Sequence, residues 1–335
     1  MYNSKITGLG YYVPENVVTN NDLKEFMETS DEWIQERTGI EERRWIDPKT
    51  EDTTAVMGAK ASRIAIERAG LTKDDIDFIV FATLSPDMYF PGGGVQVQEM
   101  LDMGTIPALD VRNQCSGFIY AMSVADQFIK TGMYKNVLVI GAENHSGGLD
   151  KSTRGRNISV IFGDGAGAAV LSRSEEAGKG ILSTHLHSEG KHAKELVLEG
   201  PSTGNWVPGI IERNDPDDVS YFPYMNGQFV FKHAITRFSE AIVEGLEANK
   251  LEKEDIDMLI PHQANLRIAQ FIQKKFRLPD DKVYNNIMKY GNTTAASVII
   301  ALTEAWEKGK IKDNDLVVLA AFGSGFTWGS VIIRW

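Results

Sequence analysis

Apolar residues recur along the chain with two different spacings, and together these spacings predict alternating helices and strands. After Ser116 they recur every three or four residues, as on one face of a helix, and Gly132 is the expected stop. This stripe consists of Phe118, Met122, Ala125 and Ile129. Residues 76–83 instead form a short, mostly apolar stretch, which is typical of a buried strand. The chain therefore has a β/α layout.

A segment that ends a helix and enters an apolar strand occurs twice. Residues 69–83 resemble residues 247–263, with matching isoleucines displaced by 256 − 76 = 180 residues. Residues 134–143 resemble residues 312–322 in the same way, displaced by 316 − 137 = 179 residues. Two separate matches at nearly one displacement indicate a duplication.

The duplication predicts two similar α/β halves. We place them at residues 1–173 and 174–335, with sheets that are sandwiched by helices. The seam between the halves is the expected place for a site.

Two glycine-rich stretches are predicted to be irregular. Residues 158–172 favour a tight hairpin over a phosphate-binding loop, because strand-like sequence follows the glycines where a phosphate loop needs a helix. Residues 188–224 are rich in Gly, Pro, Asn and Asp, and such a long loop is typical of a lid, a pocket wall or an interface.

Composition and charge narrow the class of protein. The 335 residues carry a net charge of −11, which argues against nucleic acid or an anionic membrane as the partner. A single cysteine excludes an internal disulfide and fits a reducing cytoplasm. No signal peptide and no apolar run of about 18 residues is present, so we expect a soluble cytoplasmic protein.

The single cysteine, Cys115, lies where the helix after Ser116 begins. A thiol at a helix N-terminus faces unpaired N–H groups, which we expect to lower its pKa and favour the nucleophilic thiolate. The alternative is a small buried apolar residue, and from this stretch alone both remain open.

Three further polar positions lie at turns next to predicted strands or helices. His262 follows the strand at 258–260, where α/β proteins collect catalytic groups. Asn292 opens a helix of small residues, and Ser324 lies in a glycine turn whose N–H groups could hold an oxyanion. The alternatives are a packing histidine, a helix N-cap and a plain turn.

These pieces together resemble the β-ketoacyl-acyl-carrier-protein synthase III family, a branch of the thiolase superfamily. The stretches that carry the resemblance are TSDEWIQERTGI (29–40), CSGFIYAMSVADQFIKTG (115–132), FGDGAGAAVL (162–171), PHQANLRI (261–268), YGNTTAASV (290–298) and FGSGFTWGS (322–330). The resemblance implies a thiolase-like duplicated fold, a five-layered α/β/α/β/α sandwich.

The resemblance also implies the reaction, a decarboxylating condensation that begins fatty-acid synthesis. Cys115 would accept an acyl group from acyl-CoA, while His262 and Asn292 would bind the thioester carbonyl of malonyl-acyl-carrier protein. Backbone N–H groups of Cys115 and Ser324 would form a second oxyanion hole. The coenzyme A thioester is a substrate here, and neither a tightly bound cofactor nor a metal is implied.

Further roles follow from the same resemblance. Trp33 would stack on adenine with Arg156 or Arg154 on its other face, and the alignment from Phe162 backward favours Arg156. The other implied positions are Arg37 for phosphate, Asn265 for the pantetheine arm, Phe90 for the partner subunit's acyl pocket in a homodimer, and Lys232, Arg267, Lys274 and Lys275 for docking of the acidic carrier protein.

The chain departs from the family pattern at three places. Gln114 stands where a small residue is usual, Ser324 replaces the middle glycine of a turn, and residues 188–224 are longer than expected. A paralogue that handles longer or specialised acyl groups in secondary metabolism is therefore the alternative function. A catalytically silent partner subunit is a third possibility, which the retained Cys, His and Asn argue against.

Overall fold

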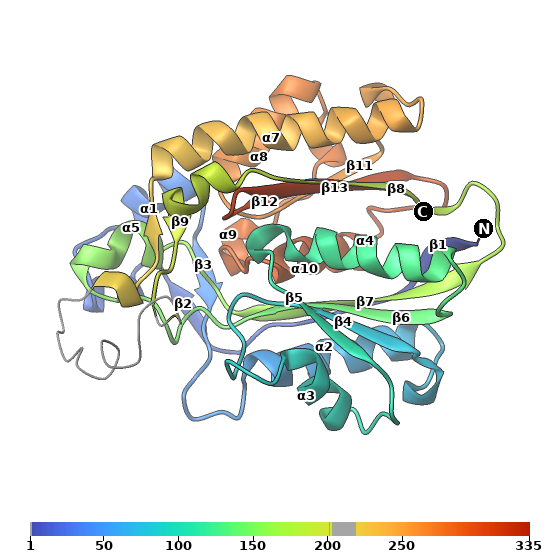
Figure 1. Ribbon diagram of the computed structural model, residues 1–335. Coiled ribbons are helices and arrows are strands. Elements are labelled where there is room, and N and C mark those ends of the chain that lie inside the picture. Colours follow the sequence, from blue (N-terminus) through green and yellow to red (C-terminus); the bar gives the residue numbers. More distant parts are fainter. Residues whose placement is uncertain (1, 201, 203–218) are drawn as a thin grey trace.

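Two sheets and three layers of helices are stacked in the computed structural model, which describes residues 2–200, 202 and 219–335 (Figure 1). The first sheet has the order β1-β7-β6-β4-β5 and the second the order β11-β12-β13-β8. The first comprises β1 (Asn3–Tyr12), β4 (Phe78–Ala82), β5 (Ala108–Val111), β6 (Asn136–Glu143) and β7 (Gly165–Ser174). The second comprises β8 (Gly180–Ser188), β11 (Met258–Pro261), β12 (Leu316–Gly323) and β13 (Thr327–Arg334).

Helices fill the middle layer and cover both outer faces (Figure 1). The middle layer is α4 (Gly117–Lys130) and α10 (Ala296–Glu307). The outer layers are α2 (Thr54–Arg68) with α3 (Gly93–Met100), and α7 (Gly227–Ala248) with α8 (Leu266–Phe276). The five-layered sandwich is confirmed.

Short elements gather at the end of the sandwich where α7 begins (Figure 1). They are α1 (Asp31–Thr38), α5 (Arg156–Ser159), α9 (Ile287–Tyr290), and the paired strands β2 (Val17–Thr19) with β3 (Glu42–Arg44) and β9 (Leu196–Val197) with β10 (Tyr224–Met225). Ser30 caps α1 by accepting the Trp33 N–H, and Gly39 ends it in a left-handed conformation.

The internal repeat is visible in the local structure. A 3-10 turn precedes β4 at Lys73–Asp75 and precedes β11 at Lys253–Asp255, and both turns begin with a capping box. Asp77 and Asp257 then each accept backbone N–H groups from the neighbouring strand, at 2.8 and 2.9 Å. The duplication is therefore real, while the division of the chain at residue 173 stays a prediction.

The core explains why α4 carries so many apolar residues. Its side chains are buried between the two sheets, and Phe118, Ile119 and Met122 are fully inaccessible to solvent. A helix packed on two sides cannot have a polar face, so its stripe widens around most of its circumference.

The hairpin predicted at residues 158–172 is wrong. Residues Arg156–Ser159 form the short helix α5, and one long strand, β7, begins at Gly165. The glycines serve close packing instead: a Cβ added to Gly163 would lie 2.1 Å from the carbonyl oxygen of Tyr290. Glycine at this position lets the chain that leads to Asn292 approach.

Candidate active site

Cys115 lies in a 3-10 turn, Gln114–Ser116, that runs directly into α4. The glycine turn after β12 packs against it, since a Cβ on Gly323 would lie 2.8 Å from the Cys115 Cβ. The backbone N–H groups of Cys115 and Ser324 both lie close enough to the thiol to lower its pKa. The two donors named from the sequence therefore converge on one sulfur atom.

The pKa of this thiol differs from the expectation. The pKa of Cys115 is raised to about 12, mainly by burial and also by the nearby Glu143 carboxylate, while the two N–H groups lower it by less. The predicted lowering is therefore wrong, because loss of water around the sulfur outweighs the helix terminus. At neutral pH the sulfur keeps its proton.

His262 directly follows β11 and is buried, with 2% of its surface exposed. Its Nδ1 lies 2.6 Å from the Ser297 Oγ, and Ser297 Oγ accepts the Gln263 N–H at 3.3 Å. The Ser297 hydroxyl hydrogen is thus free to donate to Nδ1, which leaves the ring proton on Nε2. The Nε2 atom is buried and has no partner among the described residues.

Burial also lowers the pKa of His262 to about 3, so the imidazole is neutral at physiological pH. A neutral ring with its proton on Nε2 is a hydrogen-bond donor and carries no charge of its own. It can therefore stabilise negative charge that develops on a bound carbonyl oxygen.

Asn292 is oriented by its own loop. Its Oδ1 accepts the Thr294 N–H at 2.8 Å, so the amide nitrogen Nδ2 is left to donate. Its backbone is held by the glycine stretch, because the Asn292 N–H donates to the Ile161 carbonyl at 2.8 Å and the Gly163 N–H donates to the Asn292 carbonyl at 3.1 Å.

These three side chains line a single cavity of 170 Å³. The cavity reaches outward to Asn265, which binds the Arg37 carbonyl through its side chain at 2.9 Å. Apolar side chains make up most of the wall, among them Leu196, Met225, Phe231, Phe238, Ile268 and Phe322. Cys115, His262 and Asn292 are far apart in the sequence and meet here as predicted.

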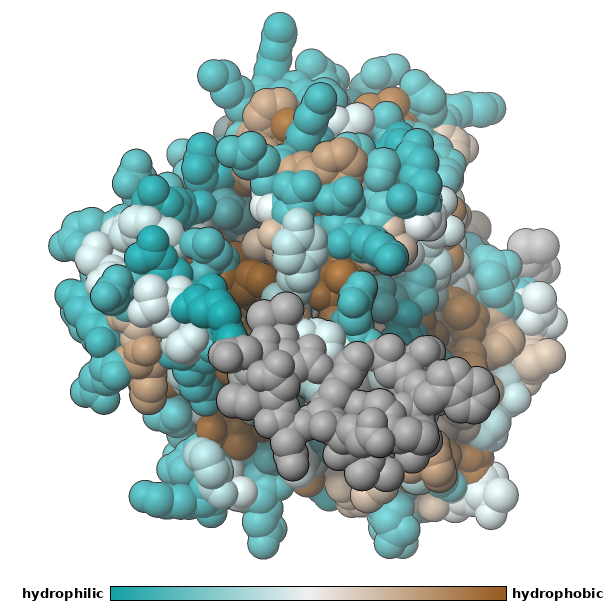
Figure 2. Space-filling model, turned by 60° about the vertical axis from the view of Figure 1, so that its left-hand side comes forward, coloured by the Kyte–Doolittle hydropathy of each residue, from teal (hydrophilic) through white to brown (hydrophobic). Residues whose placement is uncertain are grey.

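Leu196 and Met225 come from the long segment at residues 188–224 and the residue after it, and they pair across β9 and β10. The pocket-wall interpretation therefore fits the described ends of this segment, while residues 201 and 203–218 lie outside the described residues. Figure 2 turns this end of the molecule forward and shows apolar surface in a hollow beside the grey residues.

Two guanidinium groups lie close to the ring of Trp33. The Arg37 and Arg156 guanidinium carbons lie 4.5 and 4.9 Å from the Trp33 ring centroid. Arg154 instead binds Asp150 at 2.7 Å and lies over Phe222. Of the two arginines left open by the sequence, Arg156 is the one placed beside Trp33.

The four residues expected to dock the carrier protein are all exposed. Lys232 lies on α7, and Arg267, Lys274 and Lys275 lie on α8. Within the described part of the chain, none of them forms an ion pair with a carboxylate. The Arg267 guanidinium lies 5.9 Å from the ring of Phe231, which lines the cavity. Of the basic group, Arg267 therefore lies next to the wall of the cavity.

Phe90 is 81% exposed and lies outside the cavity of its own chain. Met88 and Tyr89 beside it are also exposed. Strand β5 ends the first sheet, and among the described residues it pairs with β4 alone. An exposed aromatic cluster and a free sheet edge therefore lie on the same half of the molecule.

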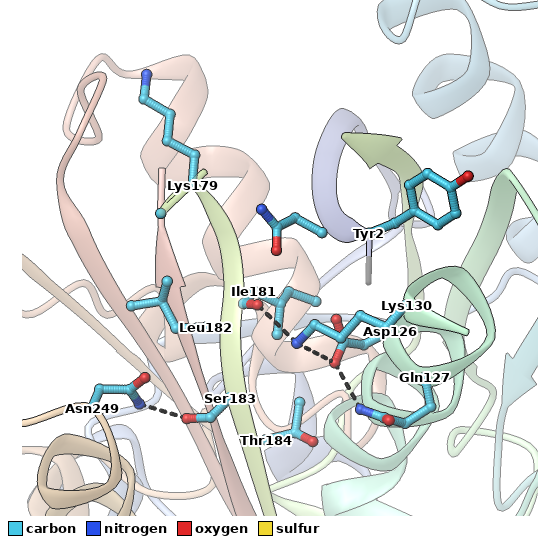
Figure 3. A pocket seen from close by; sticks show the side chains of 12 residues that line it. Tyr2, Asp126, Gln127, Lys130, Lys179, Ile181, Leu182, Ser183, Thr184 and Asn249 are labelled. Atoms are coloured by element: carbon cyan, nitrogen blue, oxygen red, sulfur yellow. Dashed lines mark hydrogen bonds and ion pairs between the residues drawn. The ribbon is translucent and has the colours of Figure 1, made fainter. Parts of the chain in front are cut away.

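A second cavity, of 510 Å³, lies at the other end of α4 (Figure 3). Lys130 pairs there with Asp126 at 2.9 Å and donates to the Ile181 carbonyl at 3.1 Å. Lys130 is fifteen residues beyond Cys115, roughly 20 Å along a helix. None of the predicted site residues lines this cavity.

No group of three or more His, Cys, Asp or Glu side chains in the described part of the chain is arranged to hold a metal ion. Among the helices so described, none combines the length and the apolar character needed to span a bilayer.

The chain is similar in sequence to known proteins of one family. Residues 109–190 match the family model 3-oxoacyl-[acyl-carrier-protein (ACP)] synthase III, and residues 246–335 match the model of its C-terminal part. The β-ketoacyl-[acyl-carrier-protein] synthase III of Caldanaerobacter subterraneus subsp. tengcongensis is 48% identical over 330 residues, which is 98% of this chain and 97% of that protein.

Solved structures agree with the sequence matches. The 3-oxoacyl-[acyl-carrier-protein] synthase III of Aquifex aeolicus VF5 superposes with a TM-score of 0.89 at 42% identity, covering 99% of this chain and 100% of that one. The priming β-ketosynthase of the R1128 polyketide pathway reaches a TM-score of 0.88 at 30% identity, covering 99% and 96%. This chain belongs to the 3-oxoacyl-[acyl-carrier-protein] synthase III family, the condensing enzymes of fatty-acid biosynthesis.

Proposed function

We propose that the protein condenses an acyl-CoA with malonyl-acyl-carrier protein, with release of CO2, to give a β-ketoacyl-acyl-carrier protein. The observation that carries this proposal is the single cavity in which a buried thiol faces two neutral hydrogen-bond donors. A condensation needs both parts, since the thiol holds the acyl group and the donors stabilise the carbon nucleophile.

In the first step, the Cys115 sulfur attacks the carbonyl carbon of the acyl-CoA. The bond from that carbon to the CoA sulfur breaks, and CoA leaves as a thiol with the proton that Cys115 gives up. The N–H groups of Cys115 and Ser324 stabilise the tetrahedral oxyanion. Because Cys115 is protonated at neutral pH, its proton must leave as the bond forms.

In the second step, the malonyl thioester loses CO2 and its electron pair passes to the neighbouring carbon. His262 Nε2–H and Asn292 Nδ2–H hold the oxygen of the resulting enolate. The carbanion attacks the acyl-cysteine, the carbon–sulfur bond breaks, and the Cys115 thiolate takes a proton from water.

The substrates fit the surroundings of the cavity. Trp33, Arg37 and Arg156 would bind the nucleotide of CoA, and Asn265 the pantetheine arm. The basic group Lys232, Arg267, Lys274 and Lys275 would dock the acidic carrier. We also infer a homodimer in which Phe90 lines the partner subunit's acyl pocket, and a cytoplasmic location.

A paralogous enzyme for longer or specialised acyl groups is the second candidate. It is favoured by the long segment that supplies Leu196 and by the structural similarity to the R1128 priming β-ketosynthase. Intact-mass measurement can follow the acylation of Cys115 by acyl-CoAs of different chain lengths. This measurement distinguishes the initiating enzyme from the paralogue. Fastest labelling by the shortest chains supports initiation of fatty-acid synthesis, whereas a preference for long or branched chains supports the paralogue.

A further inference from the structure

The hydroxyl group of Ser324 makes a contact that glycine, the residue expected at this position, cannot make. Ser324 Oγ donates a hydrogen bond to the carbonyl of Leu196 in β9. The backbone of Ser324 does not need a positive φ, so a side chain is accommodated there without strain. Two departures from the family pattern, the serine and the long segment, thus touch each other.

Among the described residues, few backbone hydrogen bonds hold the wall to which Leu196 belongs. Strand β9 is two residues long, and its ladder with β10 consists of two residue pairs, Leu196 with Met225 and Val197 with Tyr224. Such a short ladder is only marginally stable by itself. The Asn226 N–H adds one bond, to the Glu195 carbonyl at 2.8 Å.

The catalytic turn also holds the start of this segment. Glu189 and Phe326 exchange two backbone hydrogen bonds, at 2.8 and 3.0 Å. Residues 189–196 are therefore attached to the turn after β12 at both ends, by Phe326 at one end and by the Ser324 hydroxyl at the other.

The wall lines the same cavity as the thiol. Cys115 and Gly323 line this cavity too, as do Asn265 and Phe231, and the Phe231 ring lies 5.9 Å from the Arg267 guanidinium. A thioester arm that reaches Cys115 through this cavity is expected to contact Leu196 and Met225. These two side chains are apolar and can pack along such an arm.

On this basis, and given the proposed function, we infer that Ser324 is a positioning residue. Its hydroxyl group fixes the Leu196–Met225 wall against the thioester arm of the substrate. Loss of one hydrogen bond of this kind changes an equilibrium constant by about three- to tenfold. Ser324→Ala and Ser324→Gly should therefore raise the half-saturating concentration for Cys115 acylation by about that factor, and Ser324→Thr, which keeps the hydroxyl, should restore it.

The experiment measures Cys115 acylation against concentration for acyl-CoA and for the corresponding acyl-pantetheine, which lacks the nucleotide. The wall meets the arm of both substrates, so the Ser324 variants should lose the same factor with each. Trp33→Ala should raise the half-saturating concentration for acyl-CoA and not for acyl-pantetheine. If it does not, the assignment of Trp33 to CoA binding is wrong, but the result with the Ser324 variants can still be interpreted.

A matched control is Ser330→Ala, which removes another buried hydroxyl that donates to a backbone carbonyl, that of Ala241 at 2.7 Å, away from the cavity. Thermal unfolding of each variant shows whether it is folded. An unchanged half-saturating concentration in Ser324→Ala would overturn the inference. A loss confined to the maximal rate would overturn it too, because the hydroxyl would then act on the Ser324 N–H.

Discussion

Single hydrogen bonds determine which nitrogen atoms of His262 and Asn292 can donate into the cavity. The Ser297 hydroxyl faces Nδ1 of His262, and the Thr294 N–H faces Oδ1 of Asn292. Both supporting residues lie in or just before α10. One helix start therefore turns two donor groups, Nε2–H and Nδ2–H, toward the same cavity.

Removal of the Ser297 hydroxyl should disturb this arrangement. In Ser297→Ala the proton of His262 would no longer be confined to Nε2, so we expect condensation to slow by up to about tenfold, the upper range for one hydrogen bond. The ¹⁵N chemical shifts of His262 should show a mixture of tautomers. Ser297→Thr should retain the wild-type shifts, and unchanged shifts in Ser297→Ala would refute this role.

Two histidines should make the free energy of unfolding depend on pH. Burial lowers the pKa of both His145 and His262 to about 3. Between pH 6.5 and 3 the unfolded chain binds a proton at each ring that the folded chain does not bind. The free energy of unfolding should therefore fall with decreasing pH by about 1.4 kcal/mol per pH unit for each histidine.

Urea unfolding at several pH values tests this expectation with a variant. His145→Gln removes one of the two rings and can keep a contact with Thr294, which His145 binds at 2.5 Å. Its free energy of unfolding should change less steeply between pH 6.5 and 3, because one histidine fewer takes up a proton on unfolding. Equal slopes for variant and wild type would contradict the neutral state of His145.

At the scale of elements, the glycine stretch before β7 places the loop that carries Asn292. A Cβ at position 163 would lie 2.1 Å from the Tyr290 carbonyl, too close for any side-chain movement to relieve. Gly163→Ala should thus displace Asn292 and reduce condensation more than acylation of Cys115.

Gly104→Ala is the matched control, because a Cβ there meets no atom within 4 Å and the residue does not need a positive φ. Separate measurement of the two half-reactions checks the prediction. Equal loss of both half-reactions in Gly163→Ala would mean that the loop acts on the fold in general and not on Asn292.

Element ends were the part of the site that the sequence could predict. His262 at the end of β11 and Asn292 before α10 follow from strand and helix signals, and the family motifs gave their roles. Contacts between distant elements could not be predicted, such as Ser297 with His262 or Ser324 with Leu196. Their partners depend on how layers pack and not on local spacing.

The same reason explains the two errors. The glycines of residues 158–172 looked like a hairpin because only local propensity was visible, whereas they allow close packing, with Gly163 facing Tyr290. The Cys115 thiol was expected to have a low pKa because a helix terminus is a local feature, while burial is set by the whole fold.

At the scale of the molecule, the exposed residues Met88, Tyr89 and Phe90 and the free edge of β5 favour a second copy as partner. Leu109 is 39% exposed on that edge. A charge there would have to be buried in a homodimer. Leu109→Lys should therefore give monomers at concentrations where the wild type sediments as a dimer.

Loss of the dimer should also slow the acylation of Cys115. If Phe90 lines the acyl pocket of the partner subunit, Leu109→Lys should acylate Cys115 more slowly as it dissociates, although Leu109 does not line the cavity. Analytical ultracentrifugation and acylation kinetics on the same samples check both statements. A wild-type monomer with full activity would rule out the dimer and the role of Phe90.

Time-resolved intact mass during a single turnover tests most directly whether Cys115, His262 and Asn292 act together in one cavity. The wild type should gain one acyl group from acyl-CoA, on Cys115, and lose it when malonyl-acyl-carrier protein is added. His262→Ala and Asn292→Ala should gain the group and retain it, and Cys115→Ala should never gain it. Acylation of Cys115→Ala, or release by the other two variants at the wild-type rate, would contradict this account.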